Sequence, residues 1–210
     1  MRKITERVPT PVLMADLERY RQLALAMGCT DAQILPADRV VVDERVTAKC
    51  ALPKCSGWGT SVHCPPHAMK PEQTRLVVSQ YRYCVFYTKE CPPSEMDLTL
   101  DRAPVHEIRR RLYETCARIE STAFYDGYHL ALGFWEGACR ALFCPGQPCA
   151  ALQPGQACRA PLKARSSMEA VGIDSMVMAA AVGWDIYPCG RSVKPEDVPF
   201  VRRMGLVLID

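Results

Sequence analysis

The stretch "KCALPKCSGWGTSVHCPPH", Lys49 to His67, places three cysteines in a segment rich in Gly, Ser and Pro. This composition predicts a loop, because these residues interrupt helices and strands. Few of its residues are large and apolar, so the loop cannot hold itself together by packing. We therefore expect its three thiols to crosslink the loop, either through disulfides or through a bound metal.

A second stretch repeats the spacing of the first. Cys50, Cys55 and Cys64 follow the pattern C-x4-C-x8-C. The same pattern recurs in Cys144, Cys149 and Cys158, and Cys139 precedes it, so the second loop holds four cysteines. The repeat predicts a single domain, 1–210, built of two similar halves. These are 38–91 with the cysteine loop 50–66, and 128–210 with the cysteine loop 139–161.

Composition favours metal over disulfides. The chain has 210 residues, 49% of them hydrophobic, so it can bury a sizeable core without the disulfide framework of short secreted proteins. No apolar run approaches the ~20 residues of a membrane span, and the N-terminal "MRKITERVPTP" carries charges where a secretory signal is apolar. These features predict a cytoplasmic protein. The net charge of +3 is spread along the chain, which argues against a nucleic-acid partner.

The periodicity of apolar residues predicts an α/β fold. Helical spacing predicts an N-terminal helix capped by Gly28 and a helix over 104–123, with the "RRR" at 109 to 111 on its solvated face. Pro71 marks the start of another helix and Asp174 the cap of a further one. Cys84 and Cys116 lie in apolar patterns and are expected in the core.

Alternating and β-branched stretches predict the strands. They cover 38–49, 81–88 and 128–137, followed by a C-terminal hairpin of "WDIY" and "GLVLID". We expect one mixed sheet with helices packed on it. Strands in parallel would place both cysteine loops at one edge of the sheet.

The kind of metal follows from the spacing of the cysteines. Neither loop contains the C-x2-C knuckle of many structural zinc sites, and Pro follows both Cys64 and Cys144, as it often follows iron–sulfur ligands. We predict iron–sulfur clusters, with zinc as the alternative. The first loop leaves one ligand position open. Its candidates are Cys91, His63, His67, a small exogenous ligand and a partner's side chain, while Cys189 has a weaker case.

Several motifs together carry a resemblance to a known family. They are "KCALPKCSGWGTSVHCPP", "GACRALFCPGQPC", "CRAP", "SSMEAVGIDS" and "GLVLID". The chain from about 35 to 210 resembles the family of predicted metal-binding proteins, domain of unknown function 2284. The resemblance implies that Cys50, Cys55 and Cys64, and the second set Cys139, Cys144, Cys149 and Cys158, are metal ligands. It implies no reaction.

These observations predict a redox protein with two 4Fe–4S clusters that transfers electrons to a partner redox protein. One alternative is an enzyme in which an open-site cluster at Cys50, Cys55 and Cys64 acts on a substrate. The other is an interaction module in which zinc has a purely structural role.

Overall fold

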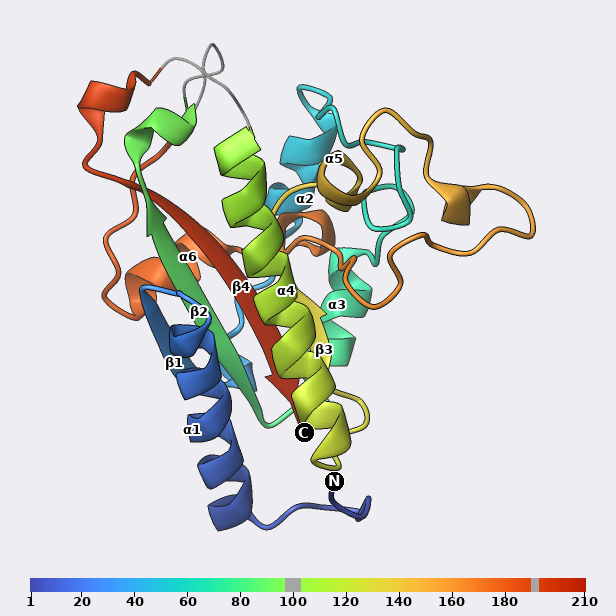
Figure 1. Ribbon diagram of the computed structural model, residues 1–210, viewed down its shortest axis with the longest axis vertical. Coiled ribbons are helices and arrows are strands. Elements are labelled where there is room, and N and C mark those ends of the chain that lie inside the picture. Colours follow the sequence, from blue (N-terminus) through green and yellow to red (C-terminus); the bar gives the residue numbers. More distant parts are fainter. Residues whose placement is uncertain (97–102, 190–192) are drawn as a thin grey trace.

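The two longest strands of the chain pair at the centre of one sheet. The computed structural model describes residues 1–96, 103–189 and 193–210, and in these the strand order is β1-β2-β4-β3 (Figure 1). The strands are β1 (Asp31–Pro36), β2 (Tyr83–Cys91), β3 (Leu132–Phe134) and β4 (Val201–Ile209). Every pairing between them is antiparallel. The α/β class is confirmed, but the expectation of a mixed sheet is wrong.

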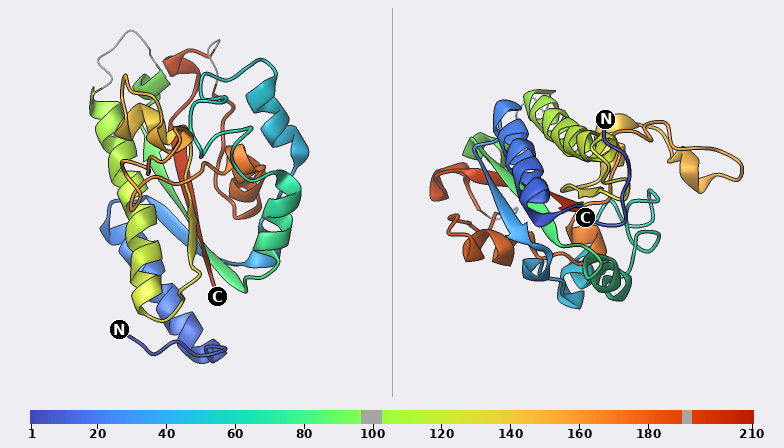
Figure 2. Two further views of the ribbon diagram at one scale, coloured as in Figure 1. Left: turned by 90° about the vertical axis from the view of Figure 1, so that its right-hand side faces the viewer. Right: turned by 90° about the horizontal axis from the view of Figure 1, so that it is seen from below.

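Helices cover both faces of this sheet. They are α1 (Thr10–Ala26), α2 (Glu44–Ala51), α3 (Pro71–Val78), α4 (Ala103–Tyr125), α5 (Cys139–Phe143) and α6 (Ser175–Ala181). The helices α1 and α4 pack on one face, and α3 and α6 lie on the other (Figures 1 and 2). Short 3-10 turns connect several of these elements.

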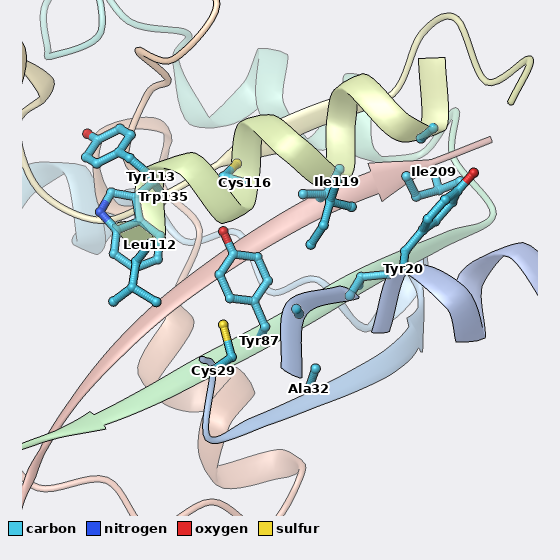
Figure 3. Packing of buried hydrophobic residues seen from close by; sticks show 14 of the residues in the cluster. Tyr20, Cys29, Ala32, Tyr87, Leu112, Tyr113, Cys116, Ile119, Trp135 and Ile209 are labelled. Carbon is cyan, nitrogen blue, oxygen red and sulfur yellow. The ribbon is translucent and has the colours of Figure 1, made fainter. Parts of the chain in front are cut away.

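The central strand β2 has side chains buried on both faces. Val85 and Tyr87 belong to the apolar cluster under α1 and α4, while Cys84 and Phe86 belong to the cluster on the opposite face. Successive side chains alternate between the two faces of a strand, so residues 84–87 of β2, which are covered on both sides, are apolar without interruption. Cys84 and Cys116 are fully buried, as predicted, and Figure 3 shows Cys116 in the core near Tyr87.

The predicted helix signals are confirmed. Gly28 has a φ of +94° directly after the C-cap residue of α1, a left-handed conformation that glycine adopts without strain. Pro71 is the first residue of α3. The Asp174 side chain accepts a hydrogen bond from the Val177 amide at 3.0 Å and caps α6.

The expected strand over 38–49 is wrong. This segment forms a 3-10 turn and then enters α2, while the first strand lies earlier, at β1. The Asp43 side chain accepts a hydrogen bond from the Arg45 amide at 2.8 Å and caps the helix. The charged residues that follow are good helix formers, and with the cap they outweigh the short β-branched run before them.

Two further strand predictions need correction. The strand expected over 128–137 is limited to β3, because Trp135 leaves the sheet to bridge Ser167. The segment "WDIY", 184–187, forms no strand, and β4 pairs with β2 and β3 instead. The Trp184 ring stacks on Phe86 at 4.9 Å between centroids and its Nε1 donates to Asp31 at 2.7 Å, so packing of the indole determines the path here.

Gly205 in β4 leaves room for the Trp135 ring at the end of β3. Gly205 pairs with Tyr87, and a Cβ there would lie within 2.8 Å of the Trp135 ring. The Tyr87 and Trp135 rings stack across this position, with centroids 6.1 Å apart (Figure 3). The anchored Trp135 directs the chain from β3 into the turn that leads to the second cysteine loop.

Candidate metal centre

The two cysteine loops lie side by side at one end of the sheet (Figures 1 and 2). The thiol of Cys139 donates to the Ser61 hydroxyl at 3.8 Å. A Cβ built on Gly57 would lie 3.5 Å from the Cβ of Ala138. The expectation that the two sets share one region is met, although the strands that lead there are antiparallel.

The four cysteines of the second loop line one small cavity. They are Cys139, Cys144, Cys149 and Cys158. The cavity has a volume of about 20 Å³, room for one or two water molecules. Arg140 and Arg159 also line it, and each donates a hydrogen bond to a backbone carbonyl of the same loop. The four cysteines therefore border one common space beside two arginine residues.

The three cysteines of the first loop line a different and much larger cavity. Cys50, Cys55 and Cys64 form part of the wall of a space of about 860 Å³. Its other walls come from α2, from the turn at 136–138, from the segment 167–176 and from β4. The first set thus lies at an open space, and the second set at an enclosed one.

Backbone amides donate to a sulfur atom in both sets. The Gly57 amide donates to Cys55 Sγ, and the Ala160 amide donates to Cys158 Sγ, each at 3.4 Å. A Cβ on Gly57 would lie 3.3 Å from Cys64 Sγ, so glycine leaves room for the backbone close to two thiols. Amide hydrogen bonds to ligand sulfurs stabilise bound metal and adjust its potential.

Burial keeps several of these thiols protonated. It raises the pKa of Cys50 and of Cys139 to about 11, and it also raises the pKa of Cys64. A metal binds the thiolate, so binding at neutral pH releases these protons. The buried thiols gain a stable charged form only when a metal compensates the charge.

Comparison with known proteins gives one result for this chain. Residues 33–209 match the family model described as predicted metal-binding protein (DUF2284). This chain belongs to the DUF2284 family. The matched range contains both cysteine sets, and the resemblance predicted from the sequence is confirmed. Neither a curated protein nor a solved structure gives a significant match.

In this DUF2284 protein Cys91, His63 and His67 do not line the cavity of the first set, whereas Cys189 does. Cys91 is buried, pairs with Val201 and does not line the large cavity, and the parallel strands expected to bring it there are absent among the described pairings. His63 lines the small cavity, with Nδ1 3.2 Å from the Ser166 hydroxyl. His67 is exposed and lines neither cavity. Cys189, the weaker candidate, lines the large one.

The large cavity of this DUF2284 protein also has charged residues that the sequence did not single out. Glu136 and Arg203 form an ion pair of 2.8 Å at its wall. Glu169 lines it too, and burial together with the Glu136 carboxylate raises the pKa of Glu169 to about 7. Arg109, expected on the solvated face of α4, lines this cavity. The sequence "RRR" shows that this part of α4 is basic, but tertiary contacts determine which of its arginines lines the cavity.

Two negative findings hold for the described part of this DUF2284 chain. No three His, Cys, Asp or Glu side chains come close enough together to hold a single metal ion. Within the same residues, none of the helices combines the length and apolar character needed to cross a bilayer.

Proposed function

We propose that this protein is an iron–sulfur redox protein with two 4Fe–4S clusters. The second set, Cys139, Cys144, Cys149 and Cys158, holds one cluster, and the first set, Cys50, Cys55 and Cys64, holds the other. The observation that carries the proposal is the gathering of four cysteines around one cavity and of three around a second, adjacent one.

The donor set of the second loop fits such a group. Four thiolates complete the coordination of a cluster, and the Ala160 amide and the guanidinium groups of Arg140 and Arg159 offset its negative charge. The loop must open around a bound cluster, because the cavity is only about 20 Å³. Its backbone permits this, because the segment from α5 to residue 161 contains only one short regular element, the 3-10 turn Ala150–Leu152.

The contact between the two loops supports electron transfer. A bound cluster of this kind takes up and releases one electron at a time. The contact of Cys139 with Ser61 joins a cysteine of the second set to the loop of the first set. The chain thereby provides a short path between the two sets, from which electrons pass to a partner redox protein.

A second candidate function rests on the large cavity. The first set provides three thiolates, and the space of about 860 Å³ in front of them admits a molecule from solution. With its three thiolates, the first set would hold a cluster with one open iron position, and such a cluster would supply Lewis-acid chemistry to a molecule in this space. On this reading the protein is an enzyme, and the second set supplies it with electrons.

Metal content tests the proposal. Two clusters correspond to about 8 iron atoms per chain, so Cys149→Ser and Cys50→Ser should each leave about 4 in protein purified without oxygen. The matched control is Cys84→Ala, a buried core cysteine that lines neither cavity and should leave iron unchanged. Zinc in place of iron, or unchanged iron in Cys149→Ser, contradicts the proposal.

The open position of the first set has its own test. Cys91→Ala should leave both the iron content and the electron paramagnetic resonance spectrum of the reduced protein unchanged, because Cys91 does not line the cavity. Loss of about 4 iron atoms in this variant identifies Cys91 as the fourth ligand and removes the basis for an enzyme at this site.

A further inference from the structure

The two cysteine sets approach each other through their most buried members. Cys64 is the buried cysteine of the first set and Cys139 that of the second, and each is 7% exposed. The other members of both sets are partly or fully exposed. A Cβ built on Gly57 would lie 3.3 Å from Cys64 Sγ and 3.5 Å from the Cβ of Ala138, the residue before Cys139. The region between the two sets is therefore packed with protein atoms.

The hydroxyl group of Ser61 contacts a cysteine of each set. Ser61 belongs to the first loop, is fully buried and lines the small cavity of the second set. Its Oγ lies 3.8 Å from Cys139 Sγ. The Cys64 amide donates to the Ser61 carbonyl at 3.2 Å, and this turn brings the Cys64 thiol back to the Ser61 hydroxyl, which hydrogen bonds to it.

The hydrogen of this hydroxyl is available to sulfur. The His63 amide donates to Ser61 Oγ at 3.1 Å, so one acceptor position of the oxygen is occupied and the oxygen is held in place. While Cys139 is a thiol, it donates to Ser61. A metal-bound cysteine is a thiolate and has no proton to donate, so the hydroxyl then becomes the donor.

The pKa values of the two thiols agree with this contact. Burial raises the pKa of Cys64 and of Cys139, and the hydrogen bond from Ser61 to each sulfur acts in the opposite direction. Negative charge on Cys64 also raises the pKa of Cys139. A charge on one set therefore changes the energy of a charge on the other.

We propose that Ser61 is a positioning residue that couples the two metal sites. Its hydroxyl donates to Cys64 or to Cys139, because one hydrogen serves one sulfur at a time. It turns toward the set that has taken up an electron, because a buried hydrogen bond to a more negative acceptor is stronger. The hydroxyl only rotates, so no covalent bond forms or breaks, and the electron comes from an external reductant. This coupling rests on the proposed function and adds a regulation of its two sites.

A shared donor separates the two reduction potentials. The set that is reduced first gains the stronger hydrogen bond, which raises its potential. The set that is reduced second gains none, because the hydroxyl is already engaged. Ser61→Ala should therefore lower the higher potential, leave the lower one unchanged and narrow the separation between them.

Anaerobic titration with dithionite, followed by electron paramagnetic resonance, measures both potentials in the full chain purified with its metal. Ser56→Ala is the control, because Ser56 is exposed on the same loop and lines neither cavity, and it should match wild type. Ser61→Thr and Ser61→Val have the same shape and differ in the hydroxyl. The Thr variant should keep the wild-type separation, and the Val variant should show the narrowed one.

The outcomes distinguish this coupling from the proposed function. Wild-type protein without iron contradicts the proposed function and the coupling with it. Wild-type protein that takes up one electron at each set, with a separation that does not change in Ser61→Ala, overturns the coupling alone. An equal shift of both potentials in Ser61→Ala also overturns it, because a general change in the surroundings affects both sets alike. Iron content is measured in every variant, so that the compared proteins hold the same metal.

Discussion

Arg203 pairs with two carboxylates at the wall of the large cavity, and its replacement should lower the free energy of unfolding. Its guanidinium lies 2.8 Å from Glu95 and 2.8 Å from Glu136. The side chains of Arg203, Glu95 and Glu136 are 15%, 3% and 13% exposed. Removing one partner of a buried ion pair leaves an uncompensated charge and costs about 3–5 kcal/mol. Arg203→Met removes the shared partner of two such groups, so we expect a loss of about this size.

Urea denaturation followed by circular dichroism measures this loss. Arg110→Met is the matched control, because Arg110 and its partner Glu107 are 46% and 49% exposed, and an exposed pair contributes only about 0–1 kcal/mol. The triple variant Glu95→Gln, Arg203→Met, Glu136→Gln should recover most of the stability, since it leaves none of the three charges buried. A loss below about 1 kcal/mol in Arg203→Met, or a triple variant as unstable as the single one, refutes the reasoning.

Two other perturbations address the cysteine loops and Glu169. Removing metal with a chelator should speed proteolysis within the loops 50–66 and 139–161 but not within α1 or α4, because the two loops have few apolar residues to hold them. Limited proteolysis with mass spectrometry measures the cleavage sites. Equal protection of the loops with and without metal counts against this prediction. Glu169 has a folded-state pKa of about 7, above the ordinary 4.5, so the unfolded chain loses this proton first and wild-type stability falls as pH rises from 4.5 to about 7. The free energy of unfolding of Glu169→Gln should therefore exceed that of wild type by up to about 3 kcal/mol at pH 8 and should equal it at pH 4.5. A difference in urea denaturation that does not change with pH contradicts the raised pKa as its cause.

Local signals in the sequence were sufficient for most of the helices. The apolar stripes of α1 and α4, the cap at Gly28 and the capping aspartate at Asp174 act within a few residues of one another. Such interactions do not depend on what the rest of the chain does, so the sequence pattern predicts them directly.

Strand order and direction could not be predicted in the same way. β2 and β4 are far apart in the sequence, and their antiparallel pairing depends on side chains that fit across the sheet, such as Tyr87 opposite Gly205. The β-branched run before Asp43 had the composition of a strand, but the cap at Asp43 decides for a helix. A pattern of apolar residues does not indicate which of two competing local structures is the more stable.

The grouping of the cysteines into two sets was predictable, but their surroundings were not. The spacing C-x4-C-x8-C identifies the loops because ligands of one site recur at fixed separations. The large cavity, in contrast, combines α2, α4, β4 and the segment 167–176, which are distant in the sequence. Charged residues such as Glu136 and Glu169 carry no local signal of their place in the wall of this cavity.

The ion pair between Glu136 and Arg203 links the stability of the sheet to the position of both cysteine sets. Glu136 follows Trp135 at the end of β3, and its second carboxylate oxygen accepts the Met204 amide of β4 at 3.1 Å. Three residues later the chain reaches Cys139, which contacts Ser61 of the first loop. Arg203 itself lines the cavity in front of the first set. The contacts that hold the end of the sheet together therefore also fix the point from which the chain enters the second cysteine loop.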